Sequence, residues 1–190
     1  MVQYDDKRPP LPFRPAGCLA VLLVVALFVI PPAACAAATG ATVTPPAADA
    51  SAAAWLLAQV NVERRAAGRE PLVADPALAD VAAAHARDMI ARQYFAHIAP
   101  GGATPATRLH RAGIHFQAAG ENLAGHTSVA GAHAMLMASP GHRAVILGPA
   151  FTRAGIAVVP GGPYGLMIVE VFIAPPQQRP LPSLAAPPAD

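Results

Sequence analysis

The sequence predicts an α+β domain, built as a three-layer α/β/α sandwich with a mainly antiparallel central sheet. Apolar residues recur every three or four positions between residues 55 and 93, the period of helices that bury one face. The period then changes: residues 154–160 and 166–174 are apolar runs rich in β-branched residues, and Gly161-Gly162-Pro163 between them is typical of a hairpin. Because both runs are apolar on both faces, we expect helices on both sides of the sheet.

Five helices are predicted, because most begin at a Ser, Thr or Asp that can cap the first turn or end at a glycine. They cover approximately residues 55–68, 75–93, 104–113, 128–136 and 139–147. In the first helix Trp55, Leu56, Val60 and Val62 form the expected apolar side, and Arg64 is expected on another face. A further strand is expected near His115-Phe116.

Charge and cysteine positions exclude several classes of protein. The formal net charge is +2 and no run of Lys or Arg occurs, so we expect no nucleic-acid partner. Both cysteines, Cys18 and Cys35, precede the predicted domain. The domain should therefore fold without disulfides or thiolate-bound metal, and it holds no cysteine nucleophile.

The N-terminal segment, residues 1–38, is predicted to be a signal peptide or a signal anchor. Residues 16–30 are uncharged and apolar, but as a helix they span about 22 Å, less than the ~30 Å hydrocarbon core. Basic residues precede this run and small residues follow it, the pattern of a secretory signal. Lipidation at Cys35 is disfavoured, because Pro32 stands where that signal has an aliphatic residue. Every alternative places the domain outside the cytoplasm, secreted or anchored to the cytoplasmic membrane.

The rest of the chain divides into three parts. Residues 39–51 are small, polar and proline-containing, as in a linker. Residues 52–174 form the predicted domain, and residues 175–190 are a Pro-rich disordered tail. We expect a monomer that meets the membrane only through its N-terminal segment.

Seven histidines are the main candidates for site chemistry. His85 lies on the apolar side of the second helix, where a packed core histidine is expected. No HExxH motif occurs, so a zincin mechanism has no support. Four others are expected at the surface: His110, His115, His126 and His133.

His97 and His142 differ from the rest, because each stands in a turn-rich segment beside a predicted helix. His97 follows Tyr94-Phe95, and His142 lies in a Ser-Pro-Gly-His turn. Glu121 and Asn122 add a carboxylate and an amide side by side. Loops held by a rigid scaffold are where sites tend to lie, but from spacing alone a structural role for all four is the stronger alternative.

Five segments together resemble the bacterial SCP-like branch of the CAP superfamily (cysteine-rich secretory proteins, antigen 5, pathogenesis-related 1). They are LLAQVNVERRAAGREPLVADPALADVAAAHARDMI, YFAHIAPGG, RLHRAGIHFQAAGENLAG, ASPGHRAVILGPAFTRAGIAVV and VEVF. Their order and spacing agree with the family over about residues 52–174, which makes the combination specific although no single segment is. The resemblance implies the CAP fold.

The resemblance also implies a central cleft with two histidines and, in many members, two acidic residues. It places the histidines at His97 and His142 and the first acid at Glu121, with Asn122 and Ser139 lining the cleft. Ser139 stands where eukaryotic members have the second acid. Two departures are Leu136, where those members have tryptophan, and Val145, where the bacterial branch usually has asparagine.

Two neutral imidazoles can share a divalent cation such as Zn²⁺ and leave open positions for water. Glu121 could orient a histidine or a bound water, or act as a general base, which makes it the candidate catalytic residue. Glu170 interrupts an apolar strand, where a carboxylate is costly unless it is paired. We expect it to pair with Arg143 or Arg153; its alternative role is to replace the missing acid.

Two functions from different classes stay open. The first is a binding module for a lipid, glycan or small apolar ligand of the cell envelope, with a divalent cation and no organic cofactor. Sterol and lipid binding in the superfamily favour it by analogy. The second is a metal-assisted hydrolase of peptide or cell-wall material. Because the sequence offers no nucleophile with a triad, the first is the main prediction.

Overall fold

The computed structural model describes residues 47–176, in which helices and strands are interspersed along the chain. The helices are α1 (Ala50–Ala66), α2 (Pro76–Ala91), α3 (Pro105–Arg111), α4 (Val129–Ala138) and α5 (Pro140–Ile146). The strands are β1 (Val73–Ala74), β2 (Ala118–His126), β3 (Arg153–Pro160) and β4 (Leu166–Ala174). The predicted signal segment, most of the linker and most of the tail lie outside the described residues.

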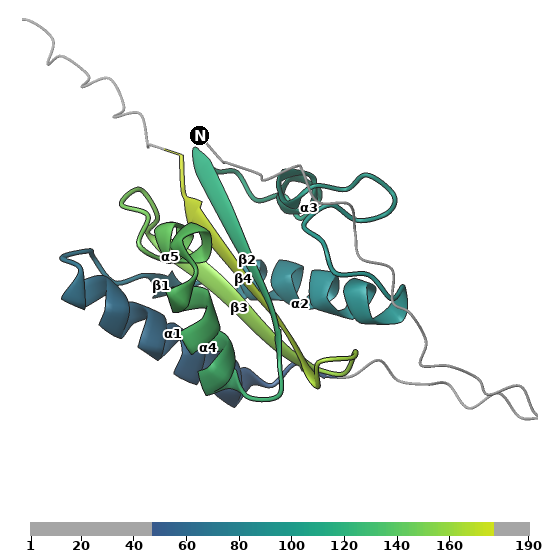
Figure 1. Ribbon diagram of the computed structural model, residues 1–190. Helices are drawn as coiled ribbons and strands as arrows, with labels where there is room; N and C mark the ends of the chain where they lie inside the picture. Colours follow the sequence, from purple (N-terminus) through teal and green to yellow (C-terminus); the bar gives the residue numbers. More distant parts are fainter. Residues whose placement is uncertain (1–46, 177–190) are drawn as a thin grey trace, which may run out of the picture.

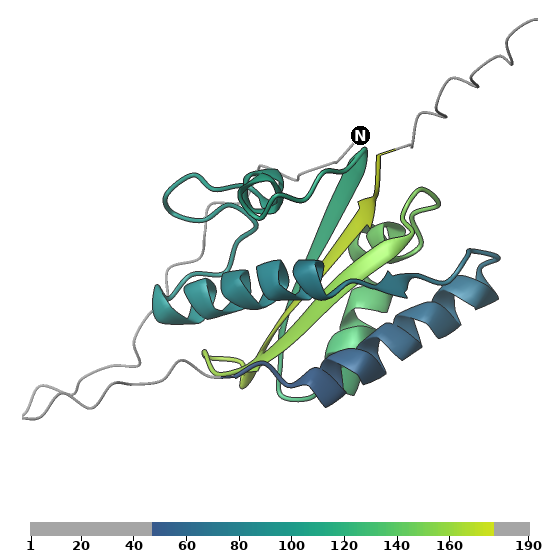
Figure 2. The ribbon, with the colours of Figure 1, turned by 180° about the vertical axis from the view of Figure 1, so that it is seen from behind.

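The four strands form one sheet in the order β1-β3-β4-β2, and this confirms the predicted mainly antiparallel sandwich. β3 and β4 form the predicted antiparallel hairpin, β2 pairs antiparallel with β4, and only the short β1 is parallel to its neighbour. Helices α1, α4 and α5 cover one face, and α2 and α3 lie on the other (Figures 1 and 2).

Both faces of β4 are buried, as its sequence predicts. Val169 and Val171 belong to a core beneath α2, whereas Ile168 and Phe172 belong to a second core beneath α1, α4 and α5. The two cores explain why the strand reads as a continuous apolar run. Among the described residues, no helix is long and apolar enough to cross a membrane.

Side-chain caps set the helix starts, and one of them corrects a predicted boundary. Asp75, Thr104 and Ser128 cap their helices as expected. Helix α1 begins at Ala50, inside the linker predicted at residues 39–51. The reason is Asp49, whose carboxylate accepts hydrogen bonds from the Ser51 and Ala52 N–H groups at 3.0 Å.

The third long strand lies at Ala118–His126, and the strand expected at His115-Phe116 is therefore misplaced. Its sequence, AAGENLAGH, contains no β-branched residue and has little strand propensity of its own. Its conformation comes from pairing with β4 along the full length, from Ala118 opposite Ala174 to His126 opposite Leu166. The two-residue β1 was also not predicted.

Arg64 corrects the predicted polarity of the first helix, because its side chain is fully buried. Trp55 and Val62, expected in the core, are 43% and 51% exposed. The guanidinium donates to four main-chain oxygens 2.6–3.1 Å away, those of Glu70, Ile146, Gly148 and Phe151. These contacts satisfy a charge that would otherwise be costly in an apolar interior.

Candidate functional site

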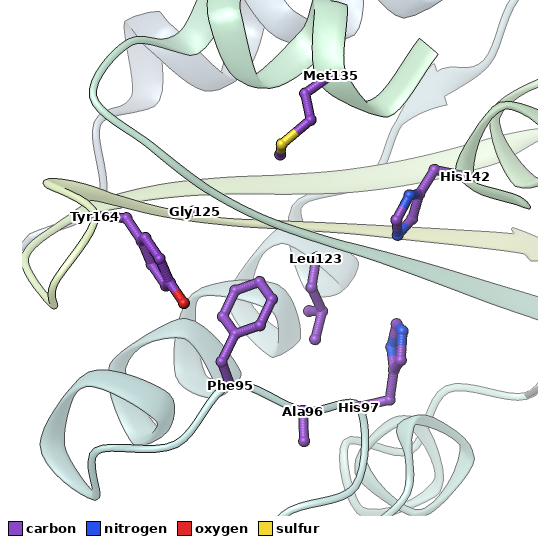
Figure 3. Close-up of a pocket in the computed structure, with 8 residues that line it drawn as sticks. All are labelled: Phe95, Ala96, His97, Leu123, Gly125, Met135, His142 and Tyr164. Carbon is purple, nitrogen blue, oxygen red and sulfur yellow. The ribbon is translucent and has the colours of Figure 1, made fainter. Parts of the chain in front are cut away.

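A pocket of about 380 Å³ lies across β2, the strand at one edge of the sheet. The loop after α2 borders it from one face of the sheet, and α4 and α5 border it from the other (Figure 3). The lining is Phe95, Ala96, His97, Leu123, Gly125, Met135, His142 and Tyr164. The fold therefore brings together the two histidines, which are far apart in the sequence.

His97 is held by a buried carboxylate. Its Nδ1 lies 2.9 Å from Oε1 of Glu121. An ionised carboxylate can only accept, so Nδ1 carries the proton and donates. In the neutral ring Nε2 is then the nitrogen with a lone pair, and the ring projects into the pocket toward His142 (Figure 3).

Glu121 is 8% exposed and lies behind His97 rather than in the pocket lining. Its Oε2 accepts from Nη2 of Arg108 at 2.7 Å. Arg108 also donates from Nη1 to the main-chain oxygens of His97 and Ala103, both at 3.0 Å. Because both carboxylate oxygens are engaged, Glu121 is a positioning residue for the His97 loop, which argues against the general-base role.

His142 lies in the first turn of α5, and its main chain is anchored from β2. The Asn122 Nδ2 group donates to the His142 main-chain oxygen at 3.2 Å. Burial lowers the pKa of His142, and the electrostatic influence of nearby His97 lowers it further. The imidazole is therefore neutral at pH 7, the form that can ligate a metal.

Like Glu121, two other residues expected in the cleft lining lie outside it. Asn122 is buried beneath α5, where it acts through the His142 main chain. Ser139 precedes Pro140 at the start of α5, and its side chain makes no capping hydrogen bond. The alternation of β2 sends Asn122 to the face opposite Glu121, so the two neighbours could not both face one cavity.

The remaining histidines mostly follow expectation. His85 is a core histidine: its Nε2 lies 3.1 Å from the Ala96 main-chain oxygen, and burial lowers its pKa to about 4. His110 and His115 are exposed, as predicted. His126 and His133 are half-buried rather than fully at the surface, and His126 Nδ1 accepts from the Ser128 N–H.

Glu170 does not pair with an arginine, contrary to the prediction. The side chain is fully buried, and its described partner is Asn122 Nδ2, 3.1 Å from Oε2. Arg153 instead pairs with Asp75 at 3.0 Å, and Arg143 is exposed. Desolvation by burial raises the pKa of Glu170 to about 7.

The two imidazoles suit an incompletely coordinated cation. Within residues 47–176, no group of three or more His, Cys, Asp or Glu side chains is arranged to hold one ion. His97 and His142 would therefore supply two ligands, and water or a bound molecule would supply the others.

Several residues of the site escaped the sequence analysis. No sequence pattern predicted a role for Arg108 in the site, because its partner Glu121 lies thirteen positions away on another element. Phe95 and Tyr164 pack edge to face with ring centroids 5.6 Å apart. Phe95 was noted only as the neighbour of Tyr94 before His97, and Tyr164 was not singled out. Leu123 and Met135 resembled ordinary core residues.

Comparisons with known proteins agree with this fold. The model of the cysteine-rich secretory protein family, CAP, matches residues 57–172. YkwD of Bacillus subtilis, described as uncharacterized, is 37% identical over 103 residues, which are 54% of this chain and 40% of YkwD. This chain thus aligns with less than half of that relative.

Two solved structures have the same architecture. An extracellular protein containing an SCP domain from Bacillus anthracis has a TM-score of 0.59 at 32% identity, over 65% of this chain and 40% of that protein. An outer surface protein of Borrelia burgdorferi has a TM-score of 0.64 at 18% identity, over 69% of this chain and 99% of that protein. The second likeness concerns the fold alone.

Proposed function

Because the chain belongs to the cysteine-rich secretory protein (CAP) family, we propose that it is an exported binding protein. Its pocket at the β2 edge would hold a small, largely apolar ligand of the cell envelope together with a divalent cation. The observation that carries the proposal is the pocket itself: two imidazoles face each other across one end, and apolar side chains line the rest.

The apolar part of the pocket supports a ligand with a hydrocarbon or ring portion. Met135 and Tyr164 are 45% and 39% exposed, although both border the pocket. Covering such side chains gains about 25 cal/mol for each Å² of apolar surface removed from water. A volume of about 380 Å³ is at the lower end of the range for small-molecule sites, which favours a compact ligand or one portion of a larger molecule.

The polar end supports a cation that the ligand helps to coordinate. Glu121 fixes the His97 tautomer, and Asn122 fixes the main chain at His142. A cation held by these two nitrogens alone would be bound weakly. An oxygen of the ligand could fill an open position, so the cation and the ligand should bind cooperatively.

A hydrolase has less support than a binding protein. No Ser, Thr or Cys lines the pocket, and Glu121 is engaged with His97 and Arg108. The pocket lining therefore offers no side-chain nucleophile, and hydrolysis here would depend on a water activated by an imidazole or by the cation.

Calorimetry with Zn²⁺ tests the metal component. The purified full chain should bind Zn²⁺, and His97→Ala and His142→Ala should each remove that binding while circular dichroism stays unchanged. The control is His115→Ala, because His115 is exposed and does not line the pocket. Equal Zn²⁺ binding by all three variants would refute the assignment of these two histidines.

Extraction and mass spectrometry test the ligand component. Protein purified from its bacterial source should release a bound apolar molecule, and a Met135→Glu variant should release much less of it.

The family relationship supports export, and so does the description of the Bacillus anthracis relative as extracellular. A fusion of residues 1–51 to a reporter active only outside the cytoplasm should be active; a soluble, inactive reporter would contradict export.

A further inference from the structure

A second groove, of about 470 Å³, lies at the opposite edge of the sheet from the histidine pocket. Helices α1 and α2 form its two walls and β3 forms its floor; Figure 2 shows β3 running between these helices. Its walls are built mostly of alanine, with Ala50, Ala53 and Ala54 from α1 and Ala79 and Ala83 from α2. Such short side chains leave room for a ligand next to the strand.

The edge of β3 forms the floor of the groove. The Gly161 N–H donates to the Gly165 oxygen at 2.8 Å, which sets the alternation of the β3–β4 hairpin. In an antiparallel pair, alternate residues point their N–H and C=O groups away from the partner strand. Residues 154, 156 and 158 of β3 therefore point these groups toward the groove.

Neighbouring segments donate hydrogen bonds to the first and third of these residues, Ala154 and Val158, but not to Ile156 between them. The Ala154 oxygen accepts from the Asp75 N–H at 2.9 Å, and the Val158 oxygen accepts from the Asp49 N–H at 2.8 Å. Strand β1 ends at Ala74. No hydrogen bond from the rest of residues 47–176 reaches the N–H or C=O of Ile156.

We propose that this groove binds a short extended peptide, which pairs with Ile156 as one additional strand residue. A residue placed opposite Ile156 can donate its N–H to the Ile156 oxygen and accept the Ile156 N–H in return. The gap between Ala154 and Val158 spans about 13 Å, enough for about three extended residues, so the ends of a longer peptide must leave the strand edge. This site is separate from the histidine pocket and does not depend on the function proposed for it.

The walls and charges of the groove define which peptide fits. The alanines restrict the side chains that point toward α1 and α2 to small ones. Three carboxylates border the groove, those of Asp49, Asp75 and Asp80, and the lining also contains the guanidinium of Arg87. Asp75 is paired with Arg153 at 3.0 Å, so the three carboxylates face two guanidinium groups. Asp49 and Asp75 lie at opposite ends and are held there by their capping hydrogen bonds. The excess of negative charge favours a peptide with a basic residue at one or both ends.

The experiment uses the peptide acetyl-Lys-Ala-Val-Ala-Lys-amide and NMR of the ¹⁵N-labelled full chain. The peptide should shift the amide signals of Ile156 and Val158, and it should leave the signals of His97 and His142 in place. A peptide methylated on the valine nitrogen lacks the N–H that pairs with Ile156 and should bind about tenfold more weakly. Without peptide, the Ile156 N–H should exchange with solvent faster than those of Ala157 and Val159, which pair with β4.

Matched variants separate this groove from nonspecific binding. Ala54→Leu fills the groove and should abolish the shifts at Ile156, whereas Ala58→Leu, one turn further along α1 and outside the groove, should keep them. Asp80→Asn should weaken binding of the lysine peptide and leave a peptide with glutamine in place of lysine unaffected. The proposal is overturned if millimolar peptide leaves Ile156 and Val158 unshifted, or if Ala54→Leu and Ala58→Leu bind alike.

Discussion

Replacing Glu170 by glutamine should stabilise the protein at neutral and alkaline pH. Glu170 is fully buried in β4, and neither its Oε1 nor the Oδ1 of Asn122 has a hydrogen-bond partner among the described residues. Burial raises the pKa of Glu170 from 4.5 to about 7. Glutamine has nearly the same shape without the charge, and its NH₂ group can donate where the carboxyl proton would.

The direction of the pH effect follows from proton uptake. Between pH 4.5 and about 7 the folded protein holds a proton on Glu170 that the unfolded chain has lost. The contribution of Glu170 to the free energy of unfolding is therefore highest below pH 4.5 and declines as the pH rises to about 7. One pKa unit corresponds to about 1.4 kcal/mol, so the loss reaches at most about 3–4 kcal/mol. Glu170→Gln should recover most of that loss at pH 8 and almost none at pH 4.5.

Urea unfolding of the full chain at these two pH values measures the effect. Glu70→Gln is the control, because Glu70 is exposed and its removal should change the free energy of unfolding little at either pH. If Glu170→Gln destabilises the protein more at pH 8 than at pH 4.5, the carboxyl is ionised and paired in the folded state. That result would refute the argument from burial.

Three further predictions follow from the core, the sheet and the pocket. Arg64→Met should lower the free energy of unfolding by at least about 3 kcal/mol, because it leaves four main-chain oxygens without their donor; Arg65→Met, on the exposed side, should have little effect in the same urea titration. Gly155→Ala should be severely destabilising, since its Cβ would lie 2.1 Å from the Ala79 nitrogen, whereas Gly101→Ala meets open space and should melt at nearly the wild-type temperature. The lowered pKa of His142 means that protons compete with metal there only at more acidic pH than for an ordinary histidine; Zn²⁺ affinity measured by calorimetry should therefore decline below pH 6.5 less steeply than that of a model imidazole.

Local signals predicted those elements whose conformation is determined by their own residues. The caps Asp75 and Ser128 lie where expected, and the hairpin of β3 and β4 could be predicted from two β-branched runs around Gly161-Gly162. β2 could not be predicted in place, because nothing in its composition favours a strand. The strand conformation of β2 is determined by β4, which supplies a pairing partner at every position.

The site could be predicted only in part, for a related reason. His97 and His142 were identified by their turn-rich surroundings and by the family resemblance. Arg108 was missed because an arginine on a short helix looks solvated until the fold places a carboxylate beside it. Arg64 and Glu170 were misjudged in the same way: composition indicates that a buried charge needs a partner but not which backbone or amide group provides one.

The edge strand β2 connects the two halves of the site through two adjacent residues. Side chains of a strand alternate between the faces of a sheet, so Glu121 reaches the loop that carries His97, and Asn122 reaches the start of the helix that carries His142. A shift of one residue in the pairing of β2 with β4 would exchange the two faces and lose both anchors. Close packing opposes such a shift, since a Cβ at Gly120 would lie 2.9 Å from Val145. The register of this one strand therefore determines whether the two imidazoles face each other.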